Sequence, residues 1–250
     1  MNNERIALVT GANKGIGLQI AREMVTKGFT VLIGARKLEL GMAAAASLGE
    51  RAQALQLDVT DQTSILAAAS QIHDRFGRLD VLINNAGIAH TGAPGRPLEE
   101  IVQSGLLSNV SVDELRDVFE VNVFGVVAVT QAMLPLLRKA PAGRIVNISS
   151  STGSLTLNSD VSHVLRNMAG VYTSSKTALN AVTQAFAIDL EKTGIKVNAV
   201  CPGFTATDMS NFASTAGSVE EAAREPVRLA LLDADGPTGT FSNAEGPLPW

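Results

Sequence analysis

The 250-residue sequence has only one cysteine, one tyrosine and one tryptophan, and its net charge is −4 at pH 7 with neutral histidines. With Cys201 alone there is no internal disulfide, and a lone cysteine is typical of a reducing compartment. No apolar run approaches the roughly 18 residues of a membrane span, and the first one is too short for a signal peptide. The slight acidity argues against nucleic acid or an anionic membrane as the main partner. We therefore expect a soluble, cytoplasmic protein.

Apolar residues are plentiful, at 46% of the chain, and they occur in short runs that alternate with helical stretches. Strands are expected at 6–9, 29–34, 52–59, 79–84, 144–149 and 196–200, with a short edge strand at 239–242. Helices are expected between them, at 16–27, 38–47, 61–76, 111–137, 172–192 and 218–232. Nearly continuous apolar strands belong to a sheet covered on both faces, and strict alternation with helices makes it parallel. The sequence predicts a single α/β domain over 1–250, with a Rossmann-type doubly wound parallel sheet flanked by helices on both faces.

Two stretches, 88–110 and 151–171, lack clear periodicity, and both follow strand ends. In doubly wound folds the ligand crevice lies at the carboxyl ends of the strands. We therefore expect these stretches, with 204–217, to wall a substrate pocket. Its apolar side chains are expected to include Leu155, Val171, Phe204 and Phe212.

Residues 10–17 read TGANKGIG, with glycines at 11, 15 and 17 rather than at the G-x-G-x-x-G spacing. The loop lies between the first strand and the first helix, where a phosphate-binding turn belongs. Glycines let the backbone approach a pyrophosphate, and the helix start offers free N–H groups. Taken alone, the loop is also compatible with an ordinary glycine-rich turn.

Two cations near this loop bear on the choice of cofactor. The second strand ends in IGARK, which places Arg36 where an NAD-binding protein usually has Asp or Glu for the ribose hydroxyl. Lys14, inside the glycine loop, is expected to converge on the same place. Either cation alone is commonly a solvated surface charge, but the two together suit a 2′-phosphate. The sequence predicts NADP(H) in preference to NAD(H).

The segment YTSSK places Tyr172 and Lys176 one helical turn apart on the same face. With TGANKGIG, DV at 58–59, NNAG at 84–87, Asn122 in VNVFG, NISS at 147–150 and CPGFTATDM at 201–209, this ordered set resembles the classical short-chain dehydrogenase/reductase family over essentially the whole chain. The glycine loop, Arg36 and the final segment are most similar to its carbonyl reductase branch.

This resemblance implies reversible hydride transfer that reduces ketones or aldehydes with NADPH. Tyr172 is the expected proton donor, and Lys176 makes its phenolate accessible and binds the nicotinamide ribose. Ser150, chosen among the serines at 149–151 by its match to NISS, is expected to hydrogen-bond the substrate oxygen. Asn122 is expected to anchor a water that links Lys176 to solvent.

The resemblance also implies where the cofactor lies. Asp58 and Val59 would flank the adenine, Asn85 would lie along the cofactor, and 203–207 would cover the nicotinamide amide. The full expected set is Gly11, Asn13, Lys14, Gly15, Ile16, Gly17, Arg36, Asp58, Val59, Asn85, Ala86, Gly87, Tyr172, Lys176, Pro202, Gly203, Phe204, Thr205 and Thr207. No metal site is expected, because the three histidines show no ligand spacing. His90 is expected mainly at the surface, and Cys201 in packing.

One departure from the family pattern concerns assembly. Ser150 and Tyr172 are farther apart than in most members, and the excess at 155–168 resembles a shortened form of the insertion of monomeric carbonyl reductases. We expect a monomer or small homo-oligomer that acts on a small apolar carbonyl or alcohol. A secondary-alcohol dehydrogenase working mainly in oxidation and a non-catalytic NADP-binding regulator are the alternatives. The presence of all four catalytic candidates argues against the regulator.

Overall fold

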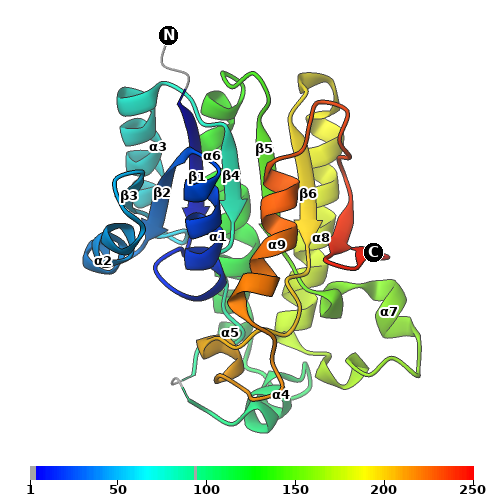
Figure 1. Cartoon of the computed structure of the whole chain (residues 1–250). Helices are drawn as coiled ribbons and strands as arrows, with labels where there is room; N and C mark the ends of the chain where they lie inside the picture. The colour runs from blue at the N-terminus through cyan, green and yellow to red at the C-terminus, as the bar shows by residue number, and fades with distance from the viewer. Residues whose placement is uncertain (1–3, 93–94) are drawn as a thin grey trace.

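The short apolar runs form the strands of one eight-stranded sheet, in the order β3-β2-β1-β4-β5-β6-β7-β8 (Figure 1). The computed structural model describes residues 4–92 and 95–250. The strands are β1 Arg5–Thr10, β2 Phe29–Ala35, β3 Ala52–Gln56, β4 Val81–Asn84, β5 Arg144–Ile148, β6 Lys196–Val200, β7 Phe241–Asn243 and β8 Gly246–Pro247. All neighbours pair in parallel except β7 and β8. The predicted doubly wound parallel sheet is confirmed, and the antiparallel β8 is an addition to it.

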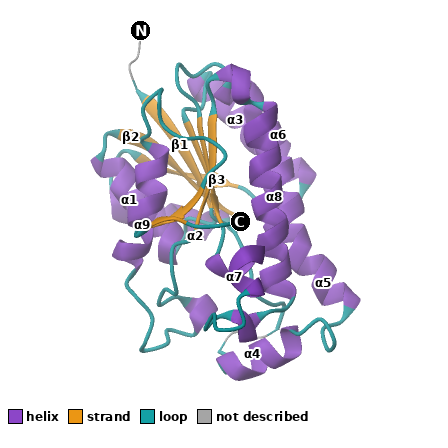
Figure 2. Cartoon of the chain, turned by 90° about the vertical axis from the view of Figure 1, so that its right-hand side faces the viewer, coloured by secondary structure: helices purple, strands orange, loops and turns teal. Residues whose placement is uncertain are grey.

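Helices cover both faces of the sheet, as Figure 2 shows edge-on. One face carries α1 Gly15–Thr26, α2 Leu38–Leu48 and α9 Val219–Ala230, and the other carries α3 Gln62–Phe76, α6 Gly125–Leu137 and α8 Val171–Asp189. Each layer buries its own apolar core against the sheet, which is why the strands are apolar on both sides.

The two stretches without periodicity contain short helices at one end of the molecule. They are α4 Leu98–Gly105 in the first and α7 Leu155–Ser159 in the second, and both lie at the lower end in Figure 1. The carboxyl ends of the parallel strands face this end. Residues 93–94 of the predicted pocket segment 88–110, and residues 1–3, lie outside the described residues.

The helix Val112–Leu137 corrects the expectation that no run approaches the length of a membrane span. It joins α5 Val112–Phe119, the π-helical turn η1 Glu120–Phe124 and α6. The helix has 26 residues and contains an 18-residue window with a mean hydropathy of 1.5, so it is long and apolar enough to cross a membrane, and 50% of that window is buried inside the protein. Buried residues such as Val129 and Met133 belong to the core on this face of the sheet, which accounts for the apolar character.

The segment 155–168 lies beside the end of the chain and not over the outer helix face. The Thr156 N–H donates to the Trp250 carbonyl at 2.9 Å, and α7 lies next to the C-terminus in Figure 1. Phe124 and Ile188, on the long helix and on α8, stay 55% and 68% exposed. The segment 155–168 therefore leaves these two helix side chains uncovered, and the expected monomer or small homo-oligomer stays a prediction.

Arg144 ties the start of β5 to the end of α9. Its side chain is buried, and its guanidinium donates to the carbonyls of Leu232 and Asp233, at 2.7 and 3.0 Å from Nη2, and of Gly143, at 2.8 Å. Carbonyls near the end of a helix lack partners within the helix. Arg144 supplies these partners, and burial lowers the pKa of its guanidinium while Asp233 opposes the shift.

We expect Arg144→Leu to lower the free energy of unfolding by about 3 kcal/mol, because several buried or partly buried carbonyls would lose their charged donor. Urea unfolding measures the change. The matched control is Arg138→Leu, since Arg138 is exposed, and we expect a change within about 0.5 kcal/mol. A loss below about 1 kcal/mol for Arg144→Leu would show that the carbonyls find other donors.

Candidate active site

The glycine loop follows β1 and comes unusually close to the segment after β4. Gly11 and Gly15 have left-handed φ angles of +63° and +58°, which other residues rarely adopt. A Cβ on Gly11 would lie 3.0 Å from Ala86 Cα, and one on Gly17 would lie 2.4 Å from Asn85 Nδ2. These glycines are therefore required by backbone conformation or by close contact.

The start of α1 is suited to an anion. Its N-cap, Lys14, makes no side-chain capping hydrogen bond, and its first turn contains no acidic residue. Backbone N–H groups at such a helix start are free to bind a phosphate, and the helix dipole favours negative charge there. The loop and the helix start fit the diphosphate of a dinucleotide, with Asn13 and Ile16 beside them.

Asn85 and Thr10 join the ends of β4 and β1. Asn85 Nδ2 donates to the carbonyls of Thr10 and Gly11, at 2.9 and 3.2 Å. The Thr10 hydroxyl oxygen accepts from the N–H groups of Asn85 and Ala86, both at 3.0 Å. Thr10 was not singled out from the sequence, although it begins the TG of the loop. These bonds hold the expected cofactor-binding residues of both strand ends in fixed register.

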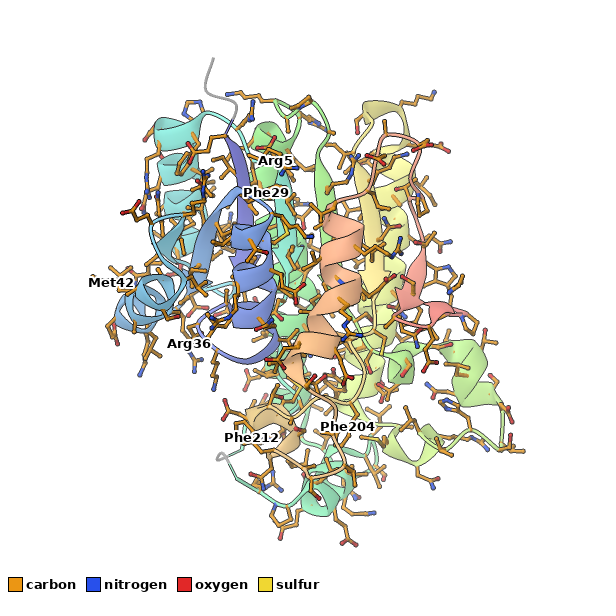
Figure 3. All side chains as sticks on the ribbon, viewed as in Figure 1. Arg5, Phe29, Arg36, Met42, Phe204 and Phe212 are labelled. Atoms are coloured by element: carbon orange, nitrogen blue, oxygen red, sulfur yellow. The ribbon has the colours of Figure 1, made fainter. Side chains whose placement is uncertain are left out.

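The two predicted cations differ in their surroundings. Arg36 follows β2, is exposed, and makes no hydrogen bond or ion pair within the described residues. Lys14 forms an ion pair with Asp208, a residue that the sequence reading passed over. Figure 3 shows Arg36, Phe204 and Phe212 toward the same end of the molecule, away from Arg5 and Phe29.

The other predicted cofactor residues follow β3 and β6. Asp58 Oδ1 accepts from the N–H and the hydroxyl of Thr60, at 3.0 and 2.7 Å, which shapes the turn after β3. After β6, Gly203 has a left-handed φ of +82°. Around these two turns lie Val59, Pro202, Phe204, Thr205 and Thr207. All of them are at the carboxyl edge of the sheet, where the crevice of a doubly wound fold lies.

Tyr172 and Lys176 come from the first turns of α8 and meet Ser150 after β5. The Ser150 hydroxyl, which hydrogen-bonds Thr152 Oγ1 at 2.9 Å, lies near enough to the Tyr172 phenol to lower its pKa, and Lys176 Nζ lies 5.6 Å from the centre of the phenol ring. The buried Lys176 ammonium donates to the Ile148 carbonyl at 2.8 Å. A hydroxyl, a phenol and an ammonium thus converge at one strand end, which is a set suited to moving a proton.

The structure distinguishes among the three neighbouring serines. Ser149 is buried, and its hydroxyl donates to Asn180 Oδ1 at 2.5 Å, away from Tyr172. Ser151 begins the short helix η2 Ser151–Gly153. Ser150 is the serine of the three whose hydroxyl acts on the pKa of the phenol, and its expected role toward the substrate oxygen stays a prediction.

Asn122 lies in η1, where the helix widens. Gly125 lets this turn pass close to the segment after β3, since a Cβ there would lie 2.8 Å from the Val59 carbonyl oxygen. Asn122 Oδ1 accepts from the Ile88 N–H at 2.9 Å, and Nδ2 donates to the Ile88 carbonyl at 2.8 Å. A Cβ on Gly87 would lie 3.2 Å from Asn122 Oδ1 and 3.5 Å from Lys176 Nζ, so both side chains border the backbone of Gly87.

Ser175 is a site residue that the sequence reading missed. Its fully buried hydroxyl accepts from Asn122 Nδ2 at 3.0 Å and donates to the Tyr172 carbonyl at 2.7 Å. It therefore connects the η1 turn to the first turn of α8. Its position in YTSSK could have indicated this, because Ser175 lies three residues after Tyr172 and shares its helix face.

Burial is the main cause of the pKa shifts of Tyr172 and Lys176. Desolvation raises the pKa of the Tyr172 phenol above its ordinary value, the nearby Cys201 sulfur adds to the rise, and the Ser150 hydrogen bond partly offsets it. Desolvation lowers the pKa of Lys176 to about 8, against a smaller opposing effect of Cys201. A lysine that makes the phenolate accessible would lower the phenol pKa. In the protein without cofactor the direction is the opposite.

The expected pocket residues do not all line open space. Val171 is buried at the start of α8, where its Cγ1 lies 3.6 Å from a Cβ built on Gly105, so it packs against α4. Leu155, Phe204 and Phe212 are 65%, 45% and 63% exposed. The prediction is therefore wrong for Val171 as an open pocket side chain.

His90 and Cys201 also follow strands at the carboxyl edge of the sheet. His90 is half-buried, and its buried Nδ1 has no hydrogen-bond partner among the described residues, so its surface role stays a prediction. Cys201 is buried and packs with Phe241, in line with its expected role. Over the ranges 4–92 and 95–250, no group of three or more His, Cys, Asp or Glu residues is placed to hold a metal ion.

Comparisons with known proteins agree with this geometry. A family model described as short chain dehydrogenase matches residues 5–217. The chain is 33% identical to salutaridine reductase of Papaver bracteatum, with 95% of this chain and 93% of the relative covered. It is 34% identical to (+)-neomenthol dehydrogenase of Arabidopsis thaliana, with 95% of each covered. The solved structure of NADPH-bound carbonyl reductase from chicken fatty liver is 28% identical, with a TM-score of 0.81 and 99% of each chain covered.

We expect Lys176→Met to stabilise the fold relative to the wild type at pH 7 more than at pH 10. The pKa of Lys176 falls from an ordinary 10.5 to about 8 on folding, so the folded state holds this proton less tightly than the unfolded state. The free energy of unfolding of the wild type therefore rises as the pH increases from about 8 to 10.5. Below about pH 8, the wild type has the whole cost of burying the charged ammonium. Urea unfolding from pH 7 to pH 10 should show the difference in the free energy of unfolding between Lys176→Met and the wild type shrinking by about 1–3 kcal/mol.

The control for this experiment is Lys192→Met, since Lys192 is exposed. Its stability difference from the wild type should not depend on pH in the same range. A pH-independent difference for Lys176→Met would mean that the buried ammonium keeps its ordinary pKa.

Proposed function

Since the chain belongs to the short-chain dehydrogenase family, and is an oxidoreductase that acts on alcohol or ketone groups, we propose that it reduces ketones and aldehydes to alcohols with NADPH. The observation that carries the proposal is the meeting of Ser150, Tyr172 and Lys176 at the end of β5, beside Asn122. The glycine loop and the open start of α1 lie at the same edge of the sheet.

Ser150 and Tyr172 act on the carbonyl oxygen of the substrate. A reduced nicotinamide dinucleotide, when bound, supplies the hydride that the carbonyl carbon accepts. The oxygen then needs a proton, and the Tyr172 O–H donates it while the Ser150 hydroxyl holds the oxygen in place. The raised phenol pKa keeps Tyr172 protonated and ready to donate at neutral pH.

Lys176 restores the proton that Tyr172 gives up. With a pKa of about 8, its ammonium both donates and regains a proton near neutrality. Its positive charge also stabilises the phenolate that remains after donation, because it lies 5.6 Å from the ring centre in a buried setting. The Ile148 carbonyl fixes the ammonium in this position. Through Ser175 and Ile88, Asn122 braces the two segments that meet here.

The preference for NADP(H) is supported by the two cations and by a structural relative. Arg36 is exposed and makes no ion pair in the described part of the chain, so its planar guanidinium is available for a phosphate. Lys14 is the N-cap residue of α1, at the same carboxyl edge of the sheet. The carbonyl reductase from chicken fatty liver, similar over 99% of this chain, binds NADPH.

Oxidation of a secondary alcohol is the second candidate, favoured by the similarity to a protein named as a dehydrogenase. The same residues serve it in reverse, with Tyr172 as phenolate taking the proton of the alcohol. Because the phenol pKa is raised, little phenolate is present at neutral pH to take the proton of an alcohol, and alcohol oxidation should be slow there. Increasing rates of alcohol oxidation at alkaline pH are expected from the same shift.

We expect Tyr172→Phe to bind NADPH almost normally and to lose carbonyl reduction by a factor of about 100 or more, because general acid catalysis contributes on that order. A panel of small apolar ketones and aldehydes, followed by loss of NADPH absorbance, measures turnover, and calorimetry measures binding. As a matched control, Phe186→Tyr adds a tyrosine on α8 away from the site and should leave turnover unchanged. Wild-type turnover in Tyr172→Phe would remove Tyr172 as the acid.

Cofactor choice is tested by Arg36→Asp, which puts a carboxylate where the 2′-phosphate would bind. Charge-assisted hydrogen bonds contribute about 1.5–3 kcal/mol, so NADPH should bind at least about tenfold more weakly, while the affinity for NADH changes less. Lys37→Asp makes the same change of charge one residue away and should affect the two cofactors alike. Equal weakening of both cofactors by Arg36→Asp would contradict the NADP preference.

A further inference from the structure

The loop 204–217 is closed at its base by backbone pairing. A parallel bridge joins Thr205 to Gly217, with the Ala206 N–H donating to the Gly217 carbonyl and the Gly217 N–H donating to the Phe204 carbonyl, both at 2.9 Å. Inside the loop, the Ser210 hydroxyl donates to the Thr205 carbonyl at 2.7 Å. The loop is therefore a small unit that moves as one body if its outer contacts change.

The outer contact of this loop is with the glycine loop. Thr207 lies over Gly15, since a Cβ added to that glycine would be 3.4 Å from the Thr207 methyl carbon. Next to it, the Asp208 carboxylate pairs with the Lys14 ammonium, and the two side chains are 50% and 67% exposed. Asp208 begins the short helix η5 Asp208–Ser210. One carboxylate thus links the loop 204–217 to the cation next to the start of α1.

The loop also contains two adjacent residues with left-handed backbone. Asn211 and Phe212 have φ angles of +49° and +50°, directly after η5. A phenylalanine adopts this conformation only where its surroundings hold it, and such positions are frequent in segments that switch. The Lys14–Asp208 pair is a contact at the tip of the loop that a ligand can replace.

We propose that Asp208 is a specificity-determining residue that competes with the 2′-phosphate of the cofactor for Lys14. The inference rests on the proposed NADP(H) preference. Lys14 has a single positive charge, and in this structure its partner is a carboxylate of the same chain. A phosphate at the same ammonium would lie next to that carboxylate, and like charges at this separation repel. NADH has no 2′-phosphate and leaves the Lys14–Asp208 pair intact.

Two consequences follow from this competition. Asp208 weakens NADPH binding more than NADH binding, so it narrows the preference that Arg36 and Lys14 create. By thermodynamic reciprocity, a cofactor that displaces Asp208 from Lys14 must also weaken the docking of the loop 204–217 on the glycine loop. NADPH therefore leaves this loop looser than NADH does. Asp208 thus couples the choice of cofactor to loop closure.

The test compares dissociation constants of NADPH and NADH by calorimetry for wild type, Asp208→Asn, Lys14→Ala and the double variant. An exposed ion pair is weak, so we expect Asp208→Asn to tighten NADPH relative to NADH by about two- to fivefold. The gain should fall at high salt and disappear in the Lys14→Ala background. Glu220→Gln, which removes an exposed charge from the first turn of α9, is the control and should leave the ratio unchanged.

Hydrogen exchange at residues 204–217 gives a second readout that needs no turnover. Wild type saturated with NADPH should exchange faster there than wild type saturated with NADH, and Asp208→Asn should remove the difference. An unchanged cofactor ratio in Asp208→Asn, or equal weakening of both cofactors, overturns the proposal while the NADP preference stands. No NADPH preference in the wild type, or no effect of Lys14→Ala on NADPH, overturns the NADP assignment and this inference together.

Discussion

The close approach of the glycine loop to residues 85–87 is the contact on which the rest of the site depends. Gly11 leaves no room for a Cβ above Ala86, and Asn85 fills the space that a side chain at Gly17 would occupy. This contact joins β1 to β4, at the point where the chain reverses the direction in which strands are added to the sheet. Doubly wound folds bind ligands at this point, because helices leave it in opposite directions and open a crevice.

The catalytic residues are positioned outward from the same contact. Ile88 follows the joined segment and holds the Asn122 side chain from both its N–H and its carbonyl. Asn122 in turn binds Ser175, which holds the Tyr172 carbonyl. A continuous set of hydrogen bonds therefore runs from the segment that braces the glycine loop to the proposed proton donor. Every member is on the backbone or on a short side chain, so little conformational freedom remains between cofactor crevice and Tyr172.

The sequence predicted the sheet, the helices around it and the site motifs, because each depends on local pattern and on strand ends that must share one edge. Contacts between segments distant in sequence were not predictable in the same way. Asp208 follows β6 and gave no local sign that it would meet Lys14. Val171 looked like a pocket residue next to Tyr172, but α4, hidden in a stretch without periodicity, covers it. The direction of the Tyr172 pKa without cofactor depends on burial, which the sequence does not give, and desolvation of a buried phenol raises its pKa.

The electrostatics of this crevice follow from where charges are left exposed and where they are buried. Arg36 is in solvent and can bind a phosphate without losing a protein partner, whereas Lys14 must first lose Asp208. Lys176 is the reverse case, since its charge is buried beside an uncharged carbonyl and its proton is held weakly. A cation that binds an anionic cofactor needs a stable charge, and exposure supplies it. A cation that exchanges protons needs a pKa near neutrality, which burial supplies at the expense of stability. The fold meets both requirements by placing the first kind after β1 and β2 and the second kind on α8.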